Sequence, residues 1–198
     1  MKFKYYDLLS HLIPGMVILL TVKFFYKDTL PEISAIPLLA IAFVLGYFTN
    51  TISSWLEGIY FFITGGNPTS KFFDKKGIWK VRYYNGNKIK NKLLAKLECS
   101  DLSNLELFGE AMRIANATDS SRLDDFNSIY AFSRSILTAV LISGGILIYS
   151  NPKVLTVYII VFILFIIALI RFRQRSGYYI REVLNIAENT IDNSENKE

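Results

Sequence analysis

Four long apolar blocks constrain the fold of this chain more than any other feature. A hydrocarbon core roughly 30 Å thick is crossed by about 20 helical residues, with a working range of roughly 17–25. Each block reaches that length, so the sequence predicts an all-α membrane protein with a four-transmembrane-helix bundle. The blocks run from Leu8 to Phe25, from Ile36 to Trp55, from Ile129 to Tyr149 and from Val154 to Ile170.

Composition excludes two other classes of protein. The chain has 198 residues, of which 52% are hydrophobic, with 15 Phe, 12 Tyr and 2 Trp. A disordered chain is charged and poor in aromatic residues, so that class is excluded. Cys99 is the only cysteine, which excludes a disulfide-stabilised scaffold.

The first block has some features of a signal peptide, because Lys2 and Lys4 precede it. However, Pro14-Gly15 interrupts the apolar run, no Ala-x-Ala-like cleavage site follows, and three more blocks come after it. We therefore expect an uncleaved anchor.

The distribution of basic residues predicts the orientation. Lys and Arg gather in residues 1–7, 56–128 and 171–198, whereas the opposite side has two short loops around Lys27 and Lys153. The positive-inside rule then places both termini and the middle segment in the cytoplasm.

Four parts are expected along the chain. Residues 1–66 hold the first two spans and an interfacial extension, and residues 67–128 form a basic and then acidic cytoplasmic segment. Residues 129–171 hold spans three and four, and residues 172–198 form a cytoplasmic tail. One helix from Ile36 to Thr64 would be about 43 Å long, so it either projects into the cytoplasm or bends at Gly58 and lies in the interface. Gly65-Gly66-Asn67-Pro68 should then end it.

Small and polar residues recur at every fourth position of spans two and three, and this spacing places each set on one helix face. In lipid, small residues allow close approach of helices and hydroxyl or amide groups hydrogen-bond across the contact. These faces either pack spans two and three together or contact other copies in a homo-oligomer. The fourth span has no such face and is expected to contact lipid. The helix-packing residues are Ala42, Gly46, Asn50 and Ser54 in span two, and Ser135, Ala139 and Ser143 in span three.

Four ionisable residues lie in or at the ends of the spans: Asp7, His11, Glu57 and Arg134. One interpretation is anchoring at the interface, since Arg134 can extend to the headgroups and Asp7 stands at a helix start. The other is a polar cluster that gates or couples the bundle, because buried charges in membranes are costly and often functional.

The cytoplasmic segment changes charge sharply. Residues 71–96 hold nine basic residues and one acid, whereas residues 97–128 hold two basic residues and seven acids. Basic residues mixed with aromatic ones suit RNA or a nucleotide, an anionic lipid surface or a protein partner, and the position beside the bilayer favours lipid. The candidate ligand or lipid patch consists of Lys75, Lys76, Trp79, Lys80, Arg82, Tyr83, Lys88 and Lys90.

Local signals predict the elements of this segment. Residues 78–84 resemble a short strand, and Asn85-Gly86 is a hairpin turn signal. A helix is expected from Leu93. Capping boxes at Ser103 to Glu106 and at Ser121 to Asp124 predict two helix starts. The segment is too small to count on a core of its own and should pack against the bundle ends.

Two apolar stripes follow the same logic. One is expected on the first capped helix, and the other on a short helix in the tail, which should become loose from Asn189. The stripes are Leu105, Phe108, Met112 and Ala115, and Ile180, Leu184, Ala187 and Ile191.

The chain lacks the residues and motifs on which most catalytic sites depend. The chain has one His and one Cys, no P-loop, no G-x-G-x-x-G and no G-x-S-x-G. We therefore expect no enzymatic activity, no cofactor and no metal.

The opening of the first span, Tyr6-Asp-Leu-Leu-Ser-His-Leu-Ile-Pro-Gly15, and the opening of the third, Ala131-Phe-Ser-Arg134, resemble a group of small bacterial four-span membrane proteins. These include antiphage defence proteins, and the chain is similar to the transmembrane accessory proteins beside type VI-B CRISPR effectors. The resemblance implies an inner-membrane protein that executes a defence response or modulates a cytoplasmic protein or ribonucleoprotein effector. A non-enzymatic membrane scaffold, or a small channel or transporter subunit, is the alternative.

Overall fold

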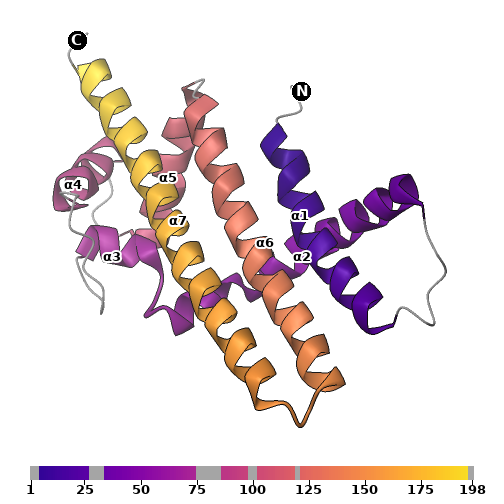
Figure 1. Cartoon of the computed structure of the whole chain (residues 1–198). Coiled ribbons are helices and arrows are strands. Elements are labelled where there is room, and N and C mark those ends of the chain that lie inside the picture. Colours follow the sequence, from indigo (N-terminus) through magenta and orange to yellow (C-terminus); the bar gives the residue numbers. More distant parts are fainter. Residues whose placement is uncertain (1–4, 27–33, 75–85, 98–101, 119–120, 196–198) are drawn as a thin grey trace. The chain divides into compact units, whose positions relative to one another are not determined.

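The computed structural model describes residues 5–26, 34–74, 86–97, 102–118 and 121–195. Within these ranges all regular structure is helical, and no strand occurs. Figure 1 shows the helices, which are α1 (Tyr5–Phe25), α2 (Ala35–Ile63), α3 (Pro68–Asp74), α4 (Gly86–Leu97), α5 (Asn104–Ala117), α6 (Ser121–Ser150) and α7 (Leu155–Glu195).

Among the described residues, three helices are long and apolar enough to cross a membrane: α2, α6 and α7. The described apolar part of α1 runs from Ser10 to Phe25 and is shorter than these three helices. The described residues are helical as predicted, and three of the four predicted blocks form helices that are long and apolar enough to cross a membrane.

The chain divides into two compact units. The first comprises residues 1–57 and 128–174, and the second comprises residues 58–127 and 175–198. Helices α2, α6 and α7 pass through the boundaries of these units, after residues 57, 127 and 174, without a break. Each of these three helices therefore contributes residues to both units.

Two glycines end α2 at the point where the sequence predicted a stop. Gly65 and Gly66 have positive φ angles of 83° and 100°. Their N–H groups donate to the carbonyls of Phe62 (3.1 Å) and Phe61 (2.8 Å), which is the pairing of a Schellman motif. Asn67 then caps α3, because its Oδ1 accepts a hydrogen bond from the Thr69 N–H at 3.0 Å.

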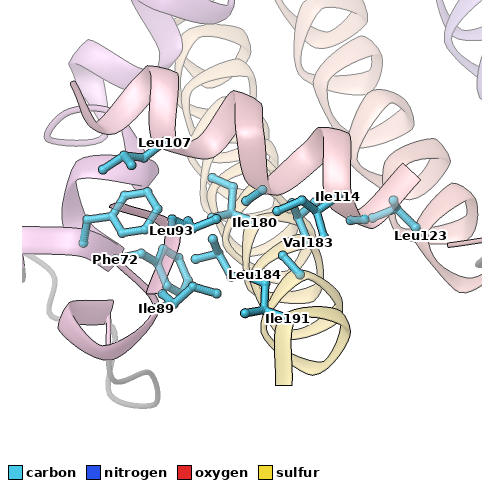
Figure 2. Packing of buried hydrophobic residues seen from close by; sticks show 14 residues of the cluster. Phe72, Ile89, Leu93, Leu107, Ile114, Leu123, Ile180, Val183, Leu184 and Ile191 are labelled. Carbon is cyan, nitrogen blue, oxygen red and sulfur yellow. The ribbon is translucent and has the colours of Figure 1, made fainter. Parts of the chain in front are cut away.

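The second unit has a hydrophobic core of its own, shown in Figure 2. Helices α3, α4 and α5 supply one part of it, including Phe73, Leu93 and Leu107, which are fully buried. Leu123 of α6 and the C-terminal part of α7, including Val183 and Leu184, supply the rest. Residues 67–128 do not form this core alone, because the tail contributes part of its apolar residues. The expected packing of the segment against the bundle ends stays a prediction.

The tail also differs from its prediction. Its apolar stripe is buried as expected, but it belongs to α7, which is continuous with the last apolar block. The helix extends to Glu195, and Ile191 is only 2% exposed, so residues 189–195 are not loose. Burial of Ile191 in the core explains the added helical turns.

The capping box at Ser103 is present, and it starts α5 as predicted. The buried face of α5 is centred on Ala111 and Ala115, with Leu107 and Ile114 beside them, whereas Leu105 is 66% exposed. The predicted stripe was therefore misplaced at Leu105. The small alanines allow the closest approach to the core, which puts the larger Phe108 and Met112 at its edge.

Helix α4 begins at Gly86, seven residues before the expected start at Leu93. A Cβ at Gly86 would lie 1.8 Å from the Phe72 carbonyl oxygen, so only glycine allows this contact between α3 and α4. The predicted strand at 78–84 and Asn85 lie outside the described residues. The second predicted turn residue, Gly86, belongs to α4.

Candidate functional site

Within the first unit, α1 and α2 approach each other at two glycines. A Cβ on Gly15 would lie 1.7 Å from the Ala42 carbonyl oxygen, and a Cβ on Gly46 would lie 1.6 Å from that of His11. No side chain fits at either position. The contact therefore depends on both glycines and brings the backbone of α2 against that of α1.

Just beyond this contact, a chain of polar groups connects three helices. The Nε2 of His11 in α1 lies 3.5 Å from the Asn50 Nδ2 of α2. The Oδ1 of the same Asn50 accepts a hydrogen bond from Ser135 Oγ of α6 at 3.0 Å. His11 Nδ1 lies 3.1 Å from Ser10 Oγ, and its ring stacks on Tyr47 with a centroid separation of 6.1 Å.

A second group joins α2 and α6 through an ion pair. Arg134 Nη1 donates to Glu57 Oε2, and Arg134 Nε donates to Ser53 Oγ at 3.1 Å. The Tyr130 hydroxyl is also hydrogen-bonded to Glu57. The Arg134 guanidinium carbon lies 5.7 Å from the centroid of the Tyr130 ring, which stacks on Phe172 of α7 at 5.8 Å.

Together these two groups form what we call the polar cluster: Ser10, His11, Asn50, Ser53, Glu57, Tyr130, Arg134 and Ser135. Arg134 and Glu57 are mostly buried, with side chains 14% and 28% exposed. An isolated charge in hydrocarbon is costly, and pairing with hydrogen bonds from neighbouring helices reduces that cost. The cluster therefore favours one particular arrangement of α1, α2 and α6.

The predicted helix-packing residues do not all face the same neighbour. On α2, Ala42 and Gly46 face α1, Asn50 reaches both α1 and α6, and Ser54 is exposed and donates to the Thr51 carbonyl of its own helix.

On α6, Ser135 and Ala139 are buried. Ser143 is buried too, and its Oγ has no hydrogen-bond partner among the described residues. The adjacent Gly144 faces Val161 of α7, whose Cγ1 would lie 2.5 Å from a Cβ at that position. Small residues of α6 thus serve contacts with more than one helix.

The predicted fourth span is exposed in the single chain, as expected for a lipid-facing helix. Several large apolar side chains in the first part of α7 are half exposed or more, among them Phe162 at 65% and Ile167 at 58%. The apolar window of α7 is 17% buried, compared with 39% for α6.

Most of the predicted ligand or lipid patch lies outside the described residues: Lys75, Lys76, Trp79, Lys80, Arg82 and Tyr83. The two described members form ion pairs within the chain. Lys88 Nζ lies 3.0 Å from Glu188 Oε1, and Lys90 Nζ lies 3.0 Å from Asp74 Oδ1. Their neighbour Lys92 donates to Asp192, and this hydrogen bond raises the pKa of Lys92 above its usual value.

Of the four predicted ionisable residues, the structure brings Glu57 and Arg134 into direct contact, and His11 joins through Asn50. Asp7 belongs to α1, but its side chain lies outside the described residues. Ser53, Tyr130 and Gly15 were missed by the sequence reasoning. A usable signal was present, because Ser53 and Glu57 are four residues apart on α2, as are Tyr130 and Arg134 on α6.

No group of three His, Cys, Asp or Glu side chains in the described part of the chain could hold a metal ion. The polar cluster instead has the composition of an interhelical contact, with one ion pair, hydroxyl and amide groups and aromatic rings. Comparison of the chain with protein-family models, with curated proteins and with solved structures finds no match.

Proposed function

We propose that this chain is a four-span protein of the bacterial inner membrane, with α1 as one of the spans and both termini in the cytoplasm. In this proposal it is a non-enzymatic effector or accessory protein of an antiphage defence system of the CRISPR type. A cytoplasmic signal received by the second unit changes the packing of the spans. The change either perturbs the membrane or modulates a cytoplasmic protein or ribonucleoprotein effector.

The observation that carries this proposal is the continuity of three helices. Each of α2, α6 and α7 contributes to the apolar first unit and to the second unit without a break. Helices that shift or rotate as rigid elements are a common means of coupling two parts of a protein. A displacement of the second unit can therefore be transmitted to the spans through these continuous helices.

The polar cluster is the contact that such a displacement would act on. Glu57 is the last residue of α2 in the first unit, and it pairs with Arg134. A mostly buried ion pair is stable when both partners meet and costly when one is withdrawn. This property favours two discrete arrangements of α2 and α6 over a continuous range.

The test is the membrane potential of bacteria that express the chain from an inducible promoter, with and without phage infection. We expect infection-dependent depolarisation, and its loss in the Glu57→Gln variant. Lys153→Gln, a change at an exposed residue of the first unit outside the polar cluster, is the control and should retain the response. An unchanged potential in cells that contain the wild-type protein in their membranes would contradict the effector proposal.

A non-enzymatic membrane scaffold is the second candidate, and one observation favours it. Lys88 and Lys90 of α4, two members of the predicted ligand patch, already form ion pairs with carboxylates of the chain. A scaffold fits this observation, because it does not need these lysines to bind a soluble ligand. This function predicts a stable partner that cross-links to the chain in cells and no change in membrane permeability on infection.

A further inference from the structure

A second set of cationic residues lies on α7, outside the polar cluster. From Leu155 to Arg181 the helix carries four arginines and no acidic residue, whereas acidic residues follow from Glu182 onward. The described carboxylates of that later part are occupied by cations of the second unit. The pairs are Glu182 with Arg122, Glu188 with Lys88 and Lys92, and Asp192 with Lys92.

Two of these arginines converge on one aromatic ring. The guanidinium carbon of Arg175 lies 5.7 Å from the centroid of the Tyr178 ring, and that of Arg181 lies 5.1 Å from it. Arg181 follows Tyr178 by three residues and Arg175 precedes it by three, so their side chains approach the ring from opposite directions along the helix axis. Both positive groups lie within about 6 Å of the centre of one ring, so an anion beside this ring would be attracted by both of them.

Arg175 also has a donor that the described chain leaves unused. Its Nε is buried and has no hydrogen-bond partner among the described residues. A buried N–H without an acceptor costs free energy, so an acceptor from outside the chain would stabilise this arrangement. Guanidinium groups suit phosphate because their N–H groups can form two parallel hydrogen bonds to it.

The position along α7 indicates where such a phosphate would come from. A hydrocarbon core roughly 30 Å thick uses about 20 helical residues, so a span that begins at Leu155 ends near Arg175. Tyr178 and Arg181 then lie about 4 Å and 9 Å farther along the axis at 1.5 Å per residue. The headgroup layer is roughly 5–7 Å thick on each side, and the Arg181 side chain leans back toward it.

We propose that Arg175, Tyr178 and Arg181 of α7 form a binding site for the phosphate of an anionic phospholipid headgroup at the cytoplasmic face of the membrane. The site rests on insertion of α7 in the membrane and on no particular signalling role. Arg171 and Arg173 lie closer to the apolar block, and their side chains can extend to the same headgroup layer.

The test uses the purified full chain in nanodiscs that contain phosphatidylglycerol diluted in phosphatidylcholine, with the lipid retained after mild delipidation counted by native mass spectrometry. We expect the wild type to enrich phosphatidylglycerol. Replacement of Arg175 and Arg181 by glutamine should lower the enrichment by about fivefold for each arginine. Arg113→Gln removes one positive charge from α5, as each single replacement does from α7, and should leave the enrichment unchanged.

Two further variants make the geometry testable. Tyr178→Phe keeps the ring and should retain most of the enrichment. The pair Arg175→Lys and Arg181→Lys keeps the charge but loses the planar fork, so it should lose part of the enrichment. This lysine pair decides the question if the glutamine pair does not fold, as judged by thermal unfolding.

Equal enrichment in the wild type and either arginine pair would overturn the site, as would an equal loss in Arg113→Gln. Inorganic phosphate that displaces phosphatidylglycerol, at an ionic strength matched with chloride, would identify a soluble anion as the ligand and overturn the lipid assignment. The readout is the lipid content of a purified protein, so its outcome is independent of depolarisation in cells.

Discussion

Arg134 of α6 donates a hydrogen bond to the Glu57 carboxylate of α2, and this contact joins residues that are 77 positions apart in the chain. Both side chains are mostly buried, and Ser53 and Tyr130 occupy further hydrogen-bonding positions around them. The ion pair therefore specifies how α2 and α6 face each other. Small residues alone would permit several such orientations.

Loss of one partner of this pair should destabilise the first unit strongly. Glu57→Gln or Arg134→Gln leaves an unpaired charge, and we expect each to cost about 3–5 kcal/mol. The double variant should cost less than the sum of the two, because the partners share one interaction. Unfolding of the purified protein by SDS in mixed micelles measures both quantities, and strictly additive costs would show that the contact is not formed.

Gly46 and Gly58 of α2 should respond to alanine in opposite directions. A Cβ at Gly46 would meet the His11 carbonyl, so Gly46→Ala must separate α1 from α2 and should cost about 1–3 kcal/mol. A Cβ at Gly58 has no neighbour within 4 Å, so Gly58→Ala should stabilise the helix by up to about 1 kcal/mol. The same SDS titration compares them. A stabilising Gly46→Ala would exclude the close approach of α1 and α2.

Leucine-to-alanine changes should lower the stability of the second unit strongly at a core position and hardly at all at a surface position. Leu93 is fully buried among the residues of Figure 2, and Leu93→Ala should cost about 2–5 kcal/mol. Leu105 is 66% exposed, and Leu105→Ala should change stability by less than about 0.5 kcal/mol. Hydrogen exchange of the α4 and α5 amides reports the difference, and equal protection in the two variants would contradict this core.

The capping box of α5 should give the second unit a dependence on pH. Hydrogen bonds from the Ser103 side chain and backbone lower the pKa of Glu106 below its usual value of 4.5. A lowered folded-state pKa gives stability that is present above pH 4.5 and is lost as the pH falls through the folded-state value.

Ser103→Ala removes the side-chain donor, so the stability difference from the wild type should shrink as the pH falls below 4.5. Exchange of the amides in the first turn of α5, followed from neutral to acidic pH, measures this difference. A difference that grows on acidification would mean that Glu106 is not held as a carboxylate by Ser103.

Apolar length predicted the three helices that are long and apolar enough to cross a membrane, α2, α6 and α7, but it also predicted a fourth that the described part of α1 does not reach. Local rules were equally informative where they act over a few residues, as at the Gly65 end of α2 and the Ser103 start of α5. Both kinds of signal depend only on residues that are close together in the sequence. Apolar blocks and cap residues can therefore be recognised in a single sequence.

Partners across the chain could not be predicted in the same way. The regular spacing of Ala42, Gly46 and Asn50 indicates a packing face, but it does not say that the first two face α1 while the third also reaches α6. The core of the second unit was missed for the same reason. Its residues from α4 and α7 lie about one hundred positions apart, as the Lys92 and Asp192 pair does, and no local pattern joins them.

The second unit is assembled from residues 58–127 and 175–198, which are separated in sequence by the α6 and α7 portions of the first unit. Ile180, Val183, Leu184, Ala187 and Ile191 are synthesised after both of those apolar stretches. During translation, the apolar faces of α3, α4 and α5 therefore lack this partner until residues 180–191 have left the ribosome. The core is complete only after the long apolar stretch of α7 has been synthesised, and a chain that stalls before residue 180 lacks five of its core residues.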